Sequence, residues 1–265
     1  MKYLNPTELP DSVVWMLGTS DDYQPVENGI GVTTLIDSVR IRMLTEKYKE
    51  HLIEDIRASV FLALGRGIHS LLEGYNKGVI EERLYANIGG MTVAGIPDLI
   101  EDHHIYDYKV TRAYMDKLYG QENTRWDHYR KQLACYRYLA HENGYDVYSH
   151  SIVAFFRDAR EEPLVKEYVL PIEPLKETRD YMERRVAAHM VPEIPLCSDE
   201  ERWTSHGKWA VKKKGSSRAT KLFDSEEQAR DWESRGYEVE KRPDRYRRCE
   251  KYCGVAYWCD QYDPL

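Results

Sequence analysis

The sequence predicts an α/β or α+β protein, in which a sheet is flanked by helices and followed by a small β-rich module. Helical and strand-like segments alternate up to residue 190, which is the pattern of a layered core. The composition shifts at residues 191–203, and shorter strand-like segments follow. The chain is long enough for one large domain with an appendage. We therefore predict a core at 1–195 and a C-terminal region at 196–265, with a ββαβ module at about 207–242.

The individual elements follow from periodicity and from turn residues. The first helix has Thr33 or Thr34 as its cap, and apolar residues recur at helical spacing in the second. Strands are expected where β-branched and aromatic residues run between turn signals. In chain order we expect helices at 31–50 and 51–76, strands at 79–88, 91–101 and 104–111, a helix at 123–142, strands at 145–158 and 164–172, and a helix at 174–190. The C-terminal module should contain strands at 208–213, 219–223 and 237–241 and a helix at 225–235, capped by Asp224 or Ser225.

One apolar stretch of the sequence contains three charged residues that should meet in space. If a hairpin turn is centred at residues 102–103, Asp98 lies directly opposite Asp107, with Cβ atoms about 5 Å apart. Lys109 follows Asp107 by two residues and shares its face of the strand. Opposed carboxylates repel each other, and a divalent cation between them would remove the repulsion. With the lysine beside it, such a site suits phosphodiester hydrolysis; the alternative is an exposed ion pair on an edge strand.

Two helices carry further polar residues at four-residue spacing. His69 and Glu73 share one helical stripe, and Gln132 and Tyr136 share another. His69 could be a metal ligand through its neutral imidazole, or it could simply pair with Glu73. Gln132 and Tyr136 could contact a substrate or position Lys109, whereas the alternative for Tyr136 is core packing.

The ordered set of motifs resembles the RecB-like branch of the PD-(D/E)XK nuclease superfamily. A helix histidine, Gly-Ile-Pro-Asp, Asp-Tyr-Lys and Gln-x-x-x-Tyr follow one another, and the resemblance covers about residues 31–190. It implies a restriction-endonuclease-like core, in which a mixed central sheet is flanked by helices. The same resemblance implies Mg²⁺ or Mn²⁺ held by His69, Asp98, Asp107 and the backbone carbonyl of Tyr108. It also implies that Lys109 orients the attacking water or stabilises the transition state, and that Gln132 and Tyr136 form the branch's additional motif. Glu73 matches a frequent acidic position of that branch and could contribute to the metal site.

Four of the five cysteines predict a metal-binding group. Cys249, Cys253 and Cys259 are closely spaced and Cys197 lies upstream, whereas Cys135 is expected to pack inside a helix. In a reducing compartment such thiols hold zinc or a [4Fe–4S] cluster. A lone cysteine with a later triplet resembles the iron–sulfur arrangement of the same branch. The Cys-x-x-x-Cys spacing and the place of Cys197 after the core depart from that arrangement, so zinc is the alternative.

Charge and hydropathy restrict the partners of the chain. The net charge of -7 excludes a uniformly basic nucleic-acid coat. Local basic runs predict DNA contacts by Lys212, Lys213, Lys214, Arg245, Arg247 and Arg248. The sequence shows neither a signal peptide nor a membrane-spanning run, so we expect a cytoplasmic protein of a bacterial or phage-infected cell with no membrane partner.

The resemblance implies a metal-dependent DNA exonuclease that acts on single-stranded ends in phage or mobile-element recombination or repair. A helicase or an annealing protein would be its partner. A structure-specific or restriction-type endonuclease of the same fold is the first alternative. A non-catalytic DNA-binding subunit is the second, although the intact Asp98, Asp107 and Lys109 argue against it.

Overall fold

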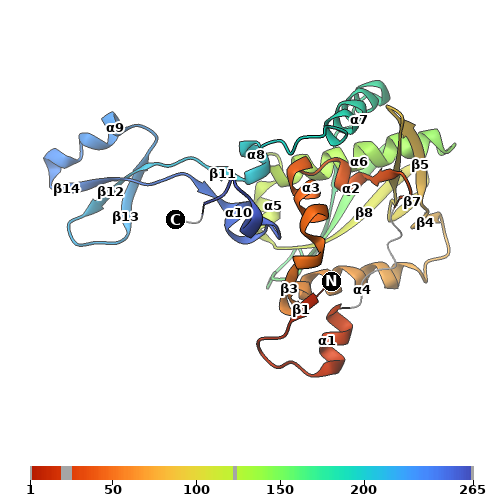
Figure 1. Cartoon of the computed structure of the whole chain (residues 1–265), viewed down its shortest axis with the longest axis horizontal. Coiled ribbons are helices and arrows are strands. Elements are labelled where there is room, and N and C mark those ends of the chain that lie inside the picture. The colour runs from red at the N-terminus through yellow and green to blue at the C-terminus, as the bar shows by residue number, and fades with distance from the viewer. Residues whose placement is uncertain (1, 19–25, 122–123, 264–265) are drawn as a thin grey trace. The chain divides into compact units, whose positions relative to one another are not determined.

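The structure is a computed structural model that describes residues 2–18, 26–121 and 124–263 (Figure 1). The chain divides into two compact units, Met1–Pro195 and Leu196–Leu265. The boundary falls within the segment where the composition of the sequence changes. Each unit has its own sheets and helices.

The first unit is built around a five-stranded mixed sheet with the strand order β10-β9-β8-β7-β4. Its strands are β4 (Val79–Ile80), β7 (Leu99–Glu101), β8 (His104–Thr111), β9 (Ser149–Phe156) and β10 (Val165–Val169). β8 and β9 are parallel, and the other neighbours are antiparallel. The predicted α/β fold with a mixed central sheet is thereby confirmed, and the central strand β8 has the predicted limits.

A second sheet and two long helices complete the core of this unit. The sheet has the order β2-β6-β5, with β2 (Gly29–Gly31), β5 (Leu84–Ile88) and β6 (Met91–Gly95). Helix α6 (Thr124–Glu142) packs against β5, β6, β8 and β9, and α7 (Leu175–His189) packs against α6. In Figure 1, α6 and α7 lie on one side of the strands and α4 (Val60–Leu72) lies on the other. The side chains at the centre of this core are fully buried: Ile105, Leu133, Leu139, Ile152 and Met182.

The N-terminal helices are shorter than predicted. Two helices, α2 (Val32–Leu35) and α3 (Val39–Tyr48), replace the single helix expected at 31–50. The break falls at Ser38, whose hydroxyl accepts a hydrogen bond from the Ile41 amide and caps α3. The remaining N-terminal elements are β1 (Lys2–Leu4), α1 (Asp11–Gly18), the 3₁₀ helix η1 (Lys49–His51), β3 (Ile53–Asp55) and the 3₁₀ helix η2 (Ile56–Ser59).

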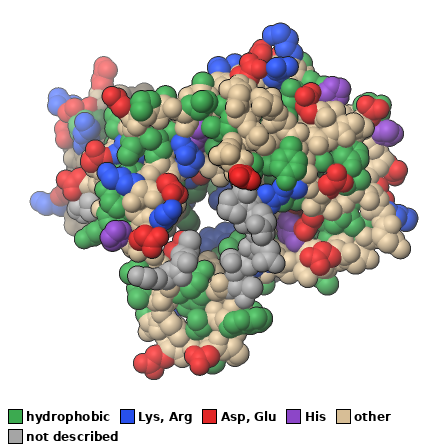
Figure 2. All heavy atoms as spheres, turned by 45° about the vertical axis from the view of Figure 1, so that its right-hand side comes forward, with side chains coloured by type: hydrophobic (Ala, Val, Ile, Leu, Met, Phe, Trp, Pro, Cys, Tyr) green, Lys and Arg blue, Asp and Glu red, His purple; other side chains and the backbone are tan. Residues whose placement is uncertain are grey.

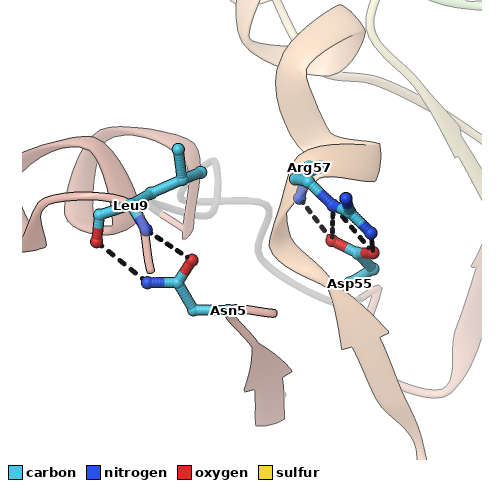
Figure 3. Close-up of polar contacts among 4 residues, drawn as sticks. All are labelled: Asn5, Leu9, Asp55 and Arg57. Atoms are coloured by element: carbon cyan, nitrogen blue, oxygen red, sulfur yellow. Dashed lines mark hydrogen bonds and ion pairs between the residues drawn. The ribbon is translucent and has the colours of Figure 1, made fainter. Parts of the chain in front are cut away.

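The helix predicted from residue 51 begins only at Val60, so this prediction was wrong at its N-terminal end. Residues 53–55 instead form β3, which pairs in parallel with β1. After β3, Asp55 accepts hydrogen bonds from the backbone amide and the guanidinium of Arg57 (Figure 3). After β1, the Asn5 side chain donates a hydrogen bond to the Leu9 carbonyl and accepts one from the Leu9 amide. Sequence periodicity cannot reveal such a pairing, because the partner strand lies at the start of the chain.

Helix α4 has the predicted apolar spacing, but none of its residues is buried. Val60, Leu64 and Leu71 are 38%, 49% and 79% exposed. Helix α1 also exposes apolar side chains, and its Trp15 is 75% exposed. Hydrophobic side chains, coloured green, are visible on the surface in the lowest part of Figure 2. The spacing therefore predicts a helix correctly, but its apolar stripe does not belong to the core.

Two predicted strands are each divided between the two sheets. The strand expected at 91–101 breaks after Gly95, because Pro97 lacks the N–H that a continuing ladder needs. The strand expected at 79–88 breaks at Glu81, whose φ of 48° turns the chain from β4 towards β5. Both breaks lie next to Asp98.

The helix expected at 123–142 corresponds to α6, although Asn123 lies outside the described residues. Short α5 (Tyr114–Leu118) was not predicted.

The second unit contains the expected ββαβ module. Strands β12 (Trp209–Lys213), β13 (Ala219–Phe223) and β14 (Tyr237–Lys241) form a sheet in the order β13-β12-β14, with α9 (Glu226–Arg230) against it. Ser225 caps α9 through its hydroxyl, as predicted, although this helix ends earlier than expected and a 3₁₀ helix η3 (Glu233–Arg235) follows. The rest of the unit consists of α8 (Asp199–Arg202), β11 (Thr204–Ser205), β15 (Arg245–Tyr246), α10 (Arg247–Lys251) and the 3₁₀ helix η4 (Ala256–Trp258).

Candidate active site

The β7–β8 hairpin has the register that the sequence predicted. Leu99 pairs with Tyr106 and Glu101 with His104, so the same register places Asp98 opposite Asp107. The two turn residues, Asp102 and His103, both have positive φ, as a two-residue turn of this kind requires. Asp98 itself lies just before β7, where Pro97 has ended the preceding strand.

Asp98 is buried but well connected. Its Oδ2 accepts a hydrogen bond from the backbone amide of Tyr108 at 2.7 Å, and its Oδ1 lies 3.5 Å from Nδ1 of His69. Burial and the neighbouring charge of Asp107 raise the pKa of Asp98 to about 7, although Lys109, His69 and the Tyr108 amide act in the opposite direction. Burial and the facing carboxylate thus favour the neutral form of this carboxyl group, whereas Lys109, His69 and the Tyr108 amide favour its charged form.

Asp107 lies in the middle of the sheet and is 1% exposed. Its Oδ2 is 2.5 Å from Nζ of Lys109. Apart from this ion pair, neither of its buried oxygens accepts a hydrogen bond from the part of the chain that the structure describes. Burial alone would lower the pKa of Lys109, but Asp107 and Asp98 outweigh it and raise that pKa above its usual value. The lysine is therefore a cation held beside two carboxylates.

Helix α4 supplies His69 from the side of the sheet opposite to α6. Nδ1 of His69 lies 3.0 Å from Oε1 of Glu81, a residue that the sequence analysis did not single out. The resemblance had suggested Glu73 as an acidic residue of the metal site. Glu73 is exposed at the C-terminal end of α4, and none of the described contacts joins it to Asp98 or Asp107. The acidic neighbour of His69 comes from the turn between β4 and β5 instead.

Gln132 and Tyr136 lie on α6, and both are buried. Nε2 of Gln132 donates a hydrogen bond to the Tyr136 hydroxyl at 2.9 Å. Burial, reinforced by Asp107, raises the pKa of Tyr136, so its phenol stays neutral. A Cβ on Gly95 would come within 2.9 Å of the Tyr136 ring, so the glycine of Gly-Ile-Pro-Asp lets α6 approach the end of β6. These residues border the carboxylates without entering the hairpin itself.

The residues around Asp98 and Asp107 suit a hard divalent cation. Carboxylate oxygens and an imidazole nitrogen are appropriate ligands, and the buried oxygens of Asp107 have spare acceptor capacity. Across the described residues, no group of three or more His, Cys, Asp or Glu side chains is closed around a single point. The ion-pair contacts of these side chains are pairwise: Lys109 pairs with Asp107, and His69 pairs with Glu81.

The four cysteines expected to bind metal all lie in the second unit, and none of the described cysteines forms a disulfide. Burial and then the nearby thiols of Cys249 and Cys259 raise the pKa of Cys253. The side chain of Gln261 bonds both backbone groups of Cys197, at 2.7 and 2.8 Å. Cys135 is fully buried in α6, as the sequence predicted, and burial raises the pKa of its thiol to about 12.

The predicted basic residues differ in how much of their charge is available. Lys212 is neutralised by Glu240 at 2.6 Å and Glu238 at 3.9 Å, and Arg245 is bonded to Glu250. Lys213, Lys214 and Arg247 are exposed, and Arg248 lies over the ring of Trp203. Among the described residues, no helix is both long and apolar enough to cross a bilayer.

Fold and site together describe an α/β protein whose central hairpin carries two facing carboxylates and a lysine. The family model described as the PD-(D/E)XK nuclease superfamily matches residues 38–260, which is most of the sequence. The chain therefore belongs to the PD-(D/E)XK nuclease superfamily, and the predicted family is confirmed.

The solved structures give more distant likenesses. SSO0001 matches with a TM-score of 0.47 and 18% identity, over 69% of this chain and 95% of that one. A candidate exonuclease from Eubacterium rectale matches with a TM-score of 0.36 and 16% identity, over 70% of this chain and 77% of that one. No match is found among curated proteins.

Proposed function

We propose that this nuclease-superfamily protein is a Mg²⁺- or Mn²⁺-dependent DNA exonuclease that degrades single-stranded ends. The observation that carries the proposal is the buried hairpin on which Asp98, Asp107 and Lys109 meet beside His69. Its context would be phage or mobile-element recombination or repair, with a helicase or an annealing protein as partner. These finer features rest on the resemblance to the RecB-like branch.

His69, Asp98, Asp107 and the Tyr108 carbonyl would hold the divalent cation. When bound, the cation supplies a water of lowered pKa and neutralises charge on the scissile phosphate. Asp98 is held in place by its hydrogen bond from the Tyr108 amide, which fixes one oxygen and leaves the other directed at His69. The protein thus presents its carboxylates in one fixed orientation, which limits reorganisation during the reaction.

Lys109 would act on the substrate side of these carboxylates. Its ammonium already lies against Asp107, and a phosphodiester entering the site would offer it a second anionic partner. In that position it can orient the attacking water or stabilise the charge that develops on phosphate oxygens. The Gln132–Tyr136 pair would fix the margin of the site, because both groups are buried and bonded to each other.

The β12–β13 hairpin would attract the DNA backbone. Residues 211–221 contain five basic and no acidic side chains. Lys212 is neutralised, but Lys213, Lys214 and Arg218 are exposed and form no ion pair with a described residue. Positive side chains on a hairpin tip contact phosphates without reading sequence, which suits an enzyme that degrades any strand.

We further propose that Cys197, Cys249, Cys253 and Cys259 hold a [4Fe–4S] cluster, with zinc as the alternative. The support is the close spacing of Cys249, Cys253 and Cys259 in the sequence, together with the two hydrogen bonds between the Gln261 side chain and the backbone of Cys197. Iron, sulfide and zinc analysis of anaerobically purified protein, together with its visible absorbance, tests this directly. Brown protein with iron and sulfide supports the cluster, and stoichiometric zinc in colourless protein replaces it with the alternative.

End-labelled and circular DNA substrates test the proposed activity. We expect wild-type protein with Mg²⁺ or Mn²⁺ to shorten linear single strands from their ends and to leave closed single-stranded circles intact. Cleavage of circles would instead identify an endonuclease of the same fold. The variants Asp107→Ala and Lys109→Ala, and the double variant that removes both charges, should be folded and inactive. Undiminished cleavage by any of them would contradict the assigned site.

A further inference from the structure

Glu81 is placed beside the proposed metal ligands by a strand pairing that the sequence does not reveal. Val79 pairs with Ile100 and Ile80 with Leu99, so the next pair in the β4–β7 register is Glu81 and Asp98. The backbone confirms the continuation, because the Glu81 amide donates to the Asp98 carbonyl at 3.2 Å. Asp98 in turn lies opposite Asp107. Three acidic residues therefore lie side by side, with Glu81 directly after β4, Asp98 directly before β7 and Asp107 within β8.

The negative charges of the three carboxylates are not equally balanced by positively charged neighbours. Asp107 has the ammonium of Lys109 at 2.5 Å, whereas the described partner of Glu81 is the imidazole of His69. Directly opposed like charges destabilise a sheet unless a cation lies between them. Glu81 also has a φ of 48°, which is an unfavourable conformation for a glutamate. The pairing of the strands alone therefore does not explain an acidic side chain at this position.

We propose that Glu81 is a further ligand of the catalytic cation, beside His69 and Asp98. Ligands at neighbouring corners of an octahedron with bonds of about 2.1 Å are about 3 Å apart. Nδ1 of His69 lies 3.0 Å from Glu81 Oε1 and 3.5 Å from Asp98 Oδ1, so both carboxylates are within reach of an ion that the imidazole would bind. This inference rests on the proposed function and adds a ligand from outside the motifs that carry the resemblance.

The experiment compares Glu81→Gln with Glu82→Gln in the full-length protein. Glu82 is the matched control, because it is the next residue but is exposed and accepts a hydrogen bond from Tyr145. Mn²⁺ affinity is measured by calorimetry, and the Mn²⁺-induced rise in Tm is measured in parallel. We expect at least a tenfold weaker affinity and a smaller Tm rise for Glu81→Gln, with wild-type values for Glu82→Gln. Without metal, Glu81→Gln should be as stable as the wild type or more stable, since it removes a repulsion.

A double-mutant cycle with His69→Ala separates a ligand from a residue that merely orients the histidine. If Glu81 binds the ion, Glu81→Gln weakens Mn²⁺ binding further in the His69→Ala background. No further loss in that background, or an unchanged affinity of the single variant, overturns the proposal. Wild-type protein that binds Mn²⁺ but cleaves no DNA would overturn the proposed function alone. Wild-type protein that cleaves DNA while Glu81→Gln binds Mn²⁺ normally would overturn this inference alone.

Discussion

Asp107 and Lys109 form the pair on which both the stability and the proposed chemistry of the hairpin depend. The carboxylate is 1% exposed, and the lysine is its one described source of positive charge. Breaking a buried pair leaves an uncompensated charge, which costs far more than the pair itself contributes. Under the proposed function, a phosphate that draws Lys109 away from Asp107 would leave the carboxylate in need of a cation, so substrate binding and metal binding would be coupled.

We predict that Lys109→Ala lowers the free energy of unfolding of metal-free protein by about 3 kcal/mol, because Asp107 is left buried and unpaired. The double variant Asp107→Ala/Lys109→Ala should regain most of this loss while remaining inactive. Urea denaturation followed by circular dichroism measures both values. Replacement of the exposed Lys117 by Ala is the control and should change little. A double variant no more stable than Lys109→Ala would contradict the charge argument.

At the scale of secondary structure, the sequence predicted the helices and strands whose apolar residues recur at a regular spacing. It did not predict those elements that depend on pairing with a strand far away in the chain. β8, β13 and β14 have the predicted limits because alternation and turn residues are local signals. The two divided strands break at Pro97 and Glu81, and only the proline is recognisable in the sequence. The contacts of His69 with Asp98 could be anticipated from motifs, but its contact with Glu81 depends on the pairing of the two-residue strand β4.

Helix α7 is anchored by a buried histidine near its C-terminal end. Nδ1 of His189 accepts a hydrogen bond from Arg42 of α3, and its Nε2–H donates to the carbonyl of Leu35 at the end of α2. Both nitrogens are thus engaged in the neutral ring. Burial, together with Arg185 and Arg42, lowers the pKa of His189 to about 4, although the Leu35 carbonyl acts in the opposite direction.

This arrangement makes the docking of α7 sensitive to acid. The unfolded chain binds a proton at His189 near pH 6.5 and the folded chain only near pH 4, so stability is full above pH 6.5 and falls as the pH decreases towards 4. We expect the contribution of His189 to fall by about 2 kcal/mol between pH 7 and pH 5. Urea denaturation at both pH values should show a shallower loss for His189→Gln than for wild type. His141→Gln, at an exposed position of α6, should keep the wild-type pH dependence.

At the scale of the whole molecule, lysine and arginine are unevenly distributed along the sequence. The chain has a net charge of -7, yet residues 207–242 contain ten lysines and arginines against seven acidic residues. This segment is inserted between β11 and β15, which pair with each other at Ser205 and Arg245. The two ends of the insertion therefore meet, so the module can be removed without separating the strands that bracket it.

We predict that replacing residues 207–242 by a short Gly-Ser linker preserves turnover at saturating DNA but weakens DNA binding. For every phosphate that the variant no longer neutralises, the slope of log K against log salt should become shallower by about 0.7 for single strands. Fluorescence anisotropy over a salt series measures this slope, and Lys213→Glu/Lys214→Glu should reproduce most of the effect in the intact chain. Lys212→Gln is the matched control, because Glu238 and Glu240 already neutralise that lysine. Equal affinity and salt dependence in the wild type and in the variant lacking the module would mean that the acidic chain binds DNA through another surface.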